Sequence, residues 1–167
     1  MNLSPVFLQQ LKNSVERILH VRGNYDGGIL EMAVVIDHCL SKEDVKEYVP
    51  QFLRALKMHS EVFRNVRLNM VDWISDSEIL NKVSPMSMVM LSGYYEEYQS
   101  NSEEKNMESL VQYLKLFQAR SKVVILITAG NCLVSDEEAL KKSMQPFLDK
   151  KMMQLIRTED GFKVQYR

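Results

Sequence analysis

Two long apolar runs dominate the pattern of hydrophobic and polar positions along the chain. Residues 29–36 and residues 122–128 are apolar at nearly every position. Such runs are typical of strands that are covered on both faces, as in a parallel sheet. Residues 66–74 form a third extended candidate, and residues 79–83 are a candidate for a short edge strand.

Apolar residues at helical spacing predict helices between these strands. The stripes fall within residues 4–20, 41–56, 107–117 and 135–148. Ser41 stands where the cap of the second helix belongs, and Pro50 is expected to kink that helix or to lie near its first turns. Ser135 is expected to cap the last helix, because Glu138 follows it three residues later.

The order of these elements predicts an α/β fold. Strands alternate with helices, which indicates a three-layer α/β/α arrangement around a doubly wound, mostly parallel sheet. Asp160 and Gly161 separate two extended runs, residues 152–158 and 162–166, and predict a C-terminal antiparallel hairpin. We expect a single domain in which residues 29–167 form the α/β body and residues 1–28 a helix and loop that pack on it.

The same topology indicates where a site would lie. Ligands of doubly wound sheets bind beyond the carboxyl ends of the strands, at the point where the strand order reverses. The loops that follow Ile36 and Thr128 are therefore the places to search.

Composition excludes several classes of protein. The 167 residues carry 21 Lys and Arg against 22 Asp and Glu, without a long basic run, which argues against nucleic-acid binding. The apolar runs are far shorter than the ~20 residues needed to cross a bilayer, so no membrane span is expected. We see no export signal and expect a cytoplasmic protein whose two cysteines, Cys39 and Cys132, are free thiols.

Two strand-end motifs carry a resemblance to a known family. Residues 34–41 form an apolar strand that ends in Asp37-His38-Cys39-Leu40-Ser41, and residues 123–130 form another that ends in Thr128-Ala129-Gly130. The first resembles the Asp-x-Ser-x-Ser motif of von Willebrand factor A domains, and the second resembles the family's Thr-Asp-Gly motif. The family's middle motif, a loop threonine, would fall near Gly93.

The resemblance implies a metal site whose ligands are only partly present. Asp37 and Ser41 keep the family's metal-binding positions, whereas Cys39 and Ala129 replace two oxygen ligands. A thiol suits magnesium poorly, and the loss of a carboxylate removes the charge that neutralises the ion. Mg²⁺ or Mn²⁺ binding is thus expected to be weak or absent, and Asp37 could instead order the loop through backbone amides.

Cys39 allows other chemistry as well. A thiolate after a strand is typical of some phosphatases, but the arginine six positions later is missing and the loop lacks glycine. A composite metal site of His38, Cys39 and Cys132 is a further alternative, because both cysteines follow neighbouring strands. The more ordinary interpretation of Cys39 is a partly buried small residue.

These observations favour a non-enzymatic protein-interaction domain with no complete catalytic or cofactor site. The face around Asp37, Ser41 and Gly93 is predicted to contact another protein, and Cys39, Gly93, Tyr94 and Tyr95 are the candidate partner-binding residues. The alternatives are a small doubly wound enzyme that uses Cys39 or Asp37 as nucleophile, or a weak divalent-metal-dependent binding module. The sequence does not indicate an oligomeric state.

Overall fold

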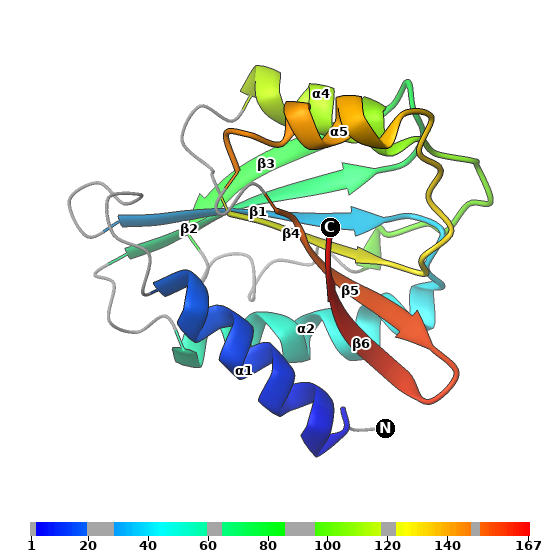
Figure 1. The fold of residues 1–167 in the computed structure, drawn as a ribbon. Helices are drawn as coiled ribbons and strands as arrows, with labels where there is room; N and C mark the ends of the chain where they lie inside the picture. The colour runs from blue at the N-terminus through cyan, green and yellow to red at the C-terminus, as the bar shows by residue number, and fades with distance from the viewer. Residues whose placement is uncertain (1–2, 20–28, 60–64, 86–95, 118–122, 148–150) are drawn as a thin grey trace.

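The computed structural model describes residues 3–19, 29–59, 65–85, 96–117, 123–147 and 151–167. Within these ranges the chain forms one six-stranded sheet with the strand order β3-β2-β1-β4-β5-β6 (Figure 1). The strands are β1 (Ile29–Asp37), β2 (Asn65–Trp73), β3 (Ile79–Pro85), β4 (Val123–Thr128), β5 (Met153–Thr158) and β6 (Gly161–Tyr166).

The sheet is mixed. Strand β1 pairs in parallel with β2 on one side and with β4 on the other, and β4 pairs in parallel with β5. The two edge strands are antiparallel, because β3 returns along β2 and β6 returns along β5. The C-terminal hairpin and the short edge strand predicted from the sequence are therefore confirmed, and the chain is an α/β protein.

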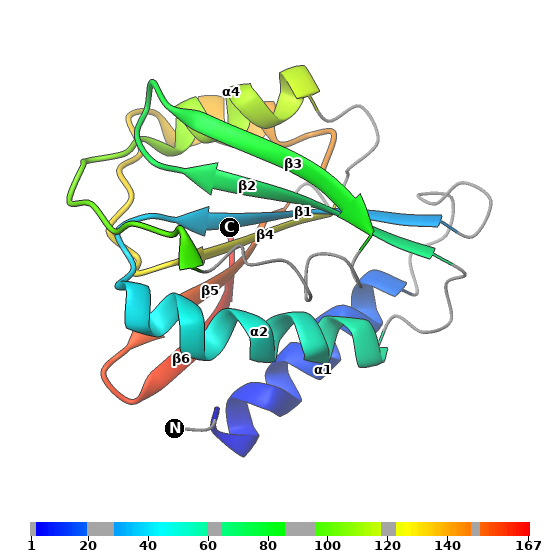
Figure 2. The same cartoon turned by 180° about the vertical axis from the view of Figure 1, so that it is seen from behind.

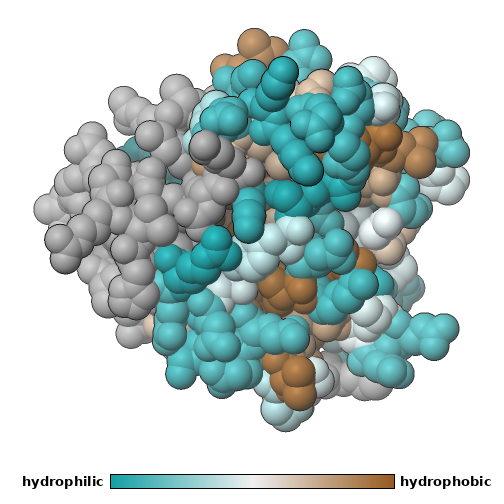
Figure 3. Space-filling view, in the orientation of Figure 1, coloured by the Kyte–Doolittle hydropathy of each residue, from teal (hydrophilic) through white to brown (hydrophobic). Residues whose placement is uncertain are grey.

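Helices lie on both sides of this sheet. Helices α1 (Pro5–Leu19) and α2 (Lys42–His59) lie against one face, and α4 (Met107–Phe117) and α5 (Glu137–Ser143) lie against the other (Figures 1 and 2). Two separate clusters of buried hydrophobic side chains fill the spaces between the sheet and the helices. On the side shown in Figure 3, hydrophobic residues on the described surface form only small, separate areas among hydrophilic ones.

The position of β1 inside the sheet explains why its sequence is apolar at nearly every position. Successive side chains of a strand point to opposite faces. Val34 and Ile36 enter the cluster beneath α1 and α2, whereas Ala33 and Val35 enter the cluster beneath α4 and α5. Because both faces are covered, the strand has no solvent-exposed face that would call for alternating polar residues.

Helix α1 contributes side chains to the buried cluster that it shares with α2. The ring of Phe7 lies 5.6 Å from that of Phe52 in α2 and 6.2 Å from that of Phe162 in β6, measured between centroids. Leu11 is fully buried in the same cluster. The N-terminal helix therefore packs against α2 and β6.

Two helix starts can be compared with their predicted caps. The hydroxyl of Ser41 accepts a hydrogen bond from the backbone N–H of Asp44 at 3.1 Å, which confirms the predicted cap of α2. The predicted cap of α5 was wrong by one residue, since Asp136 accepts the N–H groups of Glu138 and Ala139. The carboxylate of Glu108 accepts the backbone N–H groups of Ser135 and Asp136 just before this helix.

Other predictions fall outside the described ranges. They include a short helix over residues 86–91 and a turn at residues 92–93, together with the predicted contact residues Gly93, Tyr94 and Tyr95. Among the helices that the structure describes, none is both long enough and apolar enough to span a membrane.

The position of α1 gives a first prediction. Phe7→Ala should lower the free energy of unfolding by about 3–5 kcal/mol, because it removes a buried aromatic side chain and leaves a cavity. Val6 is 69% exposed on the same helix, so Val6→Ala serves as the matched control and should change stability by less than about 0.5 kcal/mol. Urea unfolding measures both, and equal losses would show that α1 is not integral to the core.

Candidate functional site

The two motifs that carry the family resemblance meet at one edge of the sheet. Asp37 ends β1 and Thr128 ends β4, and these neighbouring parallel strands finish side by side. The hydroxyl of Thr128 donates a hydrogen bond of 2.7 Å to Oδ2 of Asp37. Since β1 has β2 on one side and β4 on the other, this edge is the point where the strand order reverses, which is where such sheets bind ligands.

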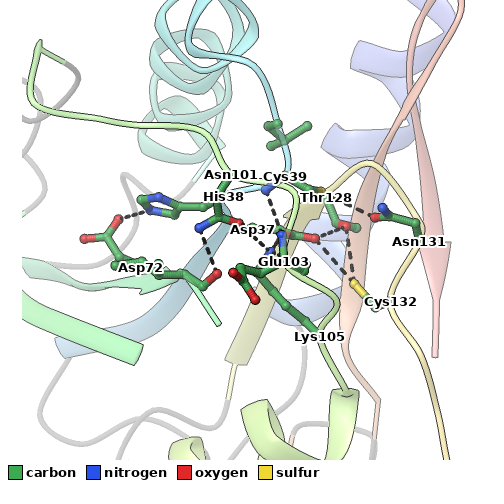
Figure 4. A network of polar contacts seen from close by, with 12 residues as sticks. Asp37, His38, Cys39, Asp72, Asn101, Glu103, Lys105, Thr128, Asn131 and Cys132 are labelled. Atoms are coloured by element: carbon green, nitrogen blue, oxygen red, sulfur yellow. Dashed lines mark hydrogen bonds and ion pairs between the residues drawn. The ribbon is translucent and has the colours of Figure 1, made fainter. Parts of the chain in front are cut away.

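The carboxylate of Asp37 is buried, and both of its oxygens accept hydrogen bonds. Its side chain is 1% exposed. Oδ1 accepts the backbone N–H of Cys39 at 3.0 Å, and the ammonium of Lys105 lies 3.0 Å from the same oxygen. Oδ2 accepts the hydroxyl of Thr128 and the thiol of Cys132, the latter at 3.4 Å. Figure 4 shows Asp37 at the centre of this network.

These donors hold Asp37 in its charged form. Burial by itself raises the pKa of the Asp37 carboxyl. Hydrogen bonds from Cys39 and Thr128 and the positive charge of Lys105 outweigh burial, so the pKa lies below its ordinary value of 3.8. Asp37 is therefore a carboxylate at neutral pH.

Lys105 was not predicted as a site residue. Residues 99–106 are polar throughout, which is typical of a solvated loop or a helix start, yet the Lys105 side chain is only 3% exposed and paired with Asp37. A lysine two residues before the apolar stripe of α4 is the local signal, and it does not identify a partner that lies 68 residues earlier in the chain.

Residues 98–106 run across the ends of three strands and are fastened to each of them. The hydroxyl of Tyr98 donates to the carbonyl of Leu40 at 2.7 Å, and the backbone N–H of Asn101 donates to the carbonyl of His38 at 2.8 Å. The side-chain amide of Asn101 donates to the carbonyl of Ile74 at 3.0 Å. Beyond β4, the backbone of Leu133 forms a bridge to residues 105–107.

Both cysteines are free and lie beside Asp37. The thiol of Cys39 donates to the side-chain oxygen of Asn131 at 3.4 Å. Burial and the negative charge of Asp37 raise the pKa of the Cys39 thiol to about 11 and that of the Cys132 thiol to about 12. Both groups are therefore protonated at neutral pH, which is the opposite of what a nucleophilic cysteine requires.

His38 lies in a different direction from the cysteines. Its Nδ1 lies 2.9 Å from the carbonyl of Gln99 and its Nε2 lies 3.0 Å from Oδ1 of Asp72, and the ring packs 4.4 Å from that of Tyr98. Figure 4 shows the imidazole turned toward Asp72. The composite site of His38, Cys39 and Cys132 does not form, and the described residues contain no cluster of three or more His, Cys, Asp or Glu that could hold a metal.

The residues at this edge do not fit a divalent cation. Each oxygen of Asp37 already accepts two protein donors. The hydroxyl of Ser41 accepts the backbone N–H of Asp44 at the start of α2, and Ala129 supplies no side-chain ligand. A hard cation needs several oxygen ligands with enough negative charge, and a single saturated carboxylate does not provide them.

The backbone conformation after β4 requires a glycine at position 130. Its φ of +89° lies in the left-handed region, and a Cβ at this position would lie 2.9 Å from Cγ2 of Ile156. Its backbone N–H donates to the hydroxyl of Thr128 at 3.1 Å. Glycine thus allows the chain to turn directly after β4 while Thr128 remains bonded to Asp37.

Comparisons with known proteins assign the chain to no group. No protein-family model, no curated protein and no solved structure matches it.

The thiols give a prediction at this site. Cys39 and Cys132 should react with a maleimide at pH 7 much more slowly than a free cysteine peptide, because only thiolate reacts and the pKa values are raised. The rate should climb as the pH approaches 11. Mass spectrometry of timed samples from the folded protein, with the unfolded protein as control, measures it, and fast alkylation of native Cys39 at pH 7 contradicts it.

The buried ion pair gives another prediction. Asp37→Asn should cost about 3–5 kcal/mol of stability at pH 7, because it leaves a buried ammonium without its counter-ion. Because the pKa of Asp37 is lowered in the folded state, this stability is present above the ordinary pKa of 3.8 and is lost as the pH falls below it. Urea unfolding at pH values from 7 down to below 3.8 should show that the difference in unfolding free energy between wild type and Asp37→Asn becomes smaller in acid. Asp160→Asn, at an exposed turn, is the control and should show no such difference.

Proposed function

We propose that this chain is a non-enzymatic protein-interaction domain that resembles the von Willebrand factor A family, with a three-layer, doubly wound arrangement. Its partner would bind at the strand-end edge formed by the loops after β1 and β4. The observation that carries the proposal is the network around Asp37, which fixes the loops of this edge and occupies both oxygens of the Asp37 carboxylate. We also place the protein in the cytoplasm, where free cysteines such as Cys39 and Cys132 persist.

The geometry supports the resemblance at its two motifs. Asp37 and Thr128 come from motifs that are 91 residues apart, and their side chains are in direct contact. The chain nevertheless departs from the family at Cys39 and Ala129. These departures favour a partner-binding edge that works without Mg²⁺ or Mn²⁺.

The edge presents an apolar side chain on a fixed backbone. Leu133 lies in the loop between β4 and α5 and is 47% exposed. Its backbone N–H donates to the carbonyl of Lys105 at 2.9 Å, and its own carbonyl accepts the N–H of Met107 at 2.8 Å. A preorganised loop loses little conformational entropy when a partner binds, which is why fixed loops make effective contact surfaces.

The rival interpretation is a small enzyme that uses Cys39 or Asp37 as nucleophile. The raised pKa of the Cys39 thiol counts against the first residue. Asp37 is 1% exposed and hydrogen-bonded at both oxygens, which counts against the second. A nucleophile has to be reachable and activated by a neighbouring base, and neither side chain meets both conditions.

The test compares two exposed leucines. Leu133→Arg places a charge on the proposed contact edge, whereas Leu116→Arg places the same charge in the last turn of α4, where Leu116 is 77% exposed. Each protein is immobilised and exposed to extract of the source cells, and bound proteins are quantified by mass spectrometry with and without a metal chelator.

We expect one or more proteins to be retained by wild type and by Leu116→Arg, and to fall at least about tenfold with Leu133→Arg, which corresponds to about 1.4 kcal/mol. The chelator should have no effect. Melting midpoints close to wild type verify that both variants fold. Retention that is the same for all three folded proteins, or that disappears with the chelator, contradicts the proposal.

A further inference from the structure

We propose that the ammonium of Lys105 is a tethered cation that fills an oxygen-lined position between the end of β1 and residues 101–103. The chain would thus supply from its own sequence the positive charge that this edge needs. The inference rests on the contacts of one side chain and does not depend on the proposed partner binding.

Three oxygen atoms surround the ammonium. Oδ1 of Asp37 lies 3.0 Å from Nζ, the backbone carbonyl oxygen of Glu103 lies at 3.3 Å, and Oδ1 of Asn101 lies at 3.5 Å. One is a carboxylate, one a backbone carbonyl and one a side-chain amide, which are the oxygen types that hold hard cations in proteins. The ammonium of lysine has three N–H donors, so each oxygen can accept one of them.

The charge of this position fits a monovalent cation. Asp37 supplies one negative charge, and Lys105 balances it within a buried environment where an uncompensated charge would be costly. No second carboxylate contributes to the three oxygens around Nζ. A divalent ion in the same place would keep an excess positive charge, whereas the ammonium leaves the position neutral.

The tether is held at both ends of its loop. Asn101 is fixed by its bonds to the carbonyls of His38 and Ile74, and Asn106 is fixed by two hydrogen bonds of 2.8 Å to the carboxylate of Asp76. These contacts place Lys105 over the end of β1 without using its side chain. The ammonium is consequently delivered to Asp37 by a loop that has its own anchors, and removing the side chain should leave the oxygens in place.

The inference predicts that a small cation can replace the missing side chain. Lys105→Ala removes the heavy atoms that n-propylammonium contains, so this ion should enter the vacated position. The variant should melt at a lower temperature than wild type. n-Propylammonium chloride should raise its midpoint by about 3–6 °C at roughly ten times the dissociation constant, because it binds only the folded state.

The controls separate the tethered cation from a merely structural side chain. Tetramethylammonium chloride at equal concentration has the same charge without N–H donors, and it should not raise the midpoint of Lys105→Ala. Lys141→Ala alters an exposed lysine of α5 and serves as the control variant. In wild type and in Lys141→Ala, the two salts should change the melting midpoint by the same amount. If Lys105→Ala fails to fold, Lys105→Met provides a variant whose side chain has a similar length. The Asp37→Asn/Lys105→Met double variant should then melt at a higher temperature than Asp37→Asn alone and than Lys105→Met alone.

Two results would overturn the inference. One is an equal response of Lys105→Ala to the two ammonium salts over the full concentration range. The other is a double variant that melts below both single variants, since this would show that Asp37 and Lys105 stabilise the fold independently. If n-propylammonium stabilises Lys105→Ala but no partner protein is found for the wild-type chain, only the proposed function is contradicted.

Discussion

The ion pair between Asp37 and Lys105 is the constraint around which this edge of the molecule is built. Both side chains are almost completely buried, 3.0 Å apart. A buried charge is stable only when it is paired and hydrogen-bonded. The chain meets this condition with the hydroxyl of Thr128 from β4, the backbone N–H of Cys39 and the ammonium of Lys105, so donors from distant segments converge on one carboxylate.

This constraint also limits the chemistry of the edge. Burial and the negative charge of Asp37 keep Cys39 and Cys132 protonated, and the ammonium of Lys105 lies 3.0 Å from Oδ1 of Asp37. A sheet edge that commonly binds ligands is here occupied by the protein's own groups. What it offers to the outside is a set of fixed loops, with Leu133 exposed on one of them.

The sequence predicted the sheet well because its signals are local. Strands β1 and β4 are apolar on both faces, and the stripes of α1, α2 and α4 follow helical spacing, so each element could be located from a short window. The cap of α5 was placed one residue early, at Ser135, because Ser and Asp are both common capping residues and they are adjacent here. Asp37 and Ser41 were predicted together as metal ligands, and the structure adds that the Ser41 hydroxyl accepts the backbone N–H of Asp44 at the start of α2.

By itself, the sequence determined the α/β class, the C-terminal hairpin and the edge at which Asp37 and Thr128 lie, because periodicity and turn residues act over a few positions. Only the tertiary structure decided which groups surround Asp37. Lys105 lies in a polar stretch that resembles a solvated loop, and its burial depends on anchors at His38, Ile74 and Asp76. Charge compensation acts through space between segments far apart in the chain, and no local pattern of residues specifies it.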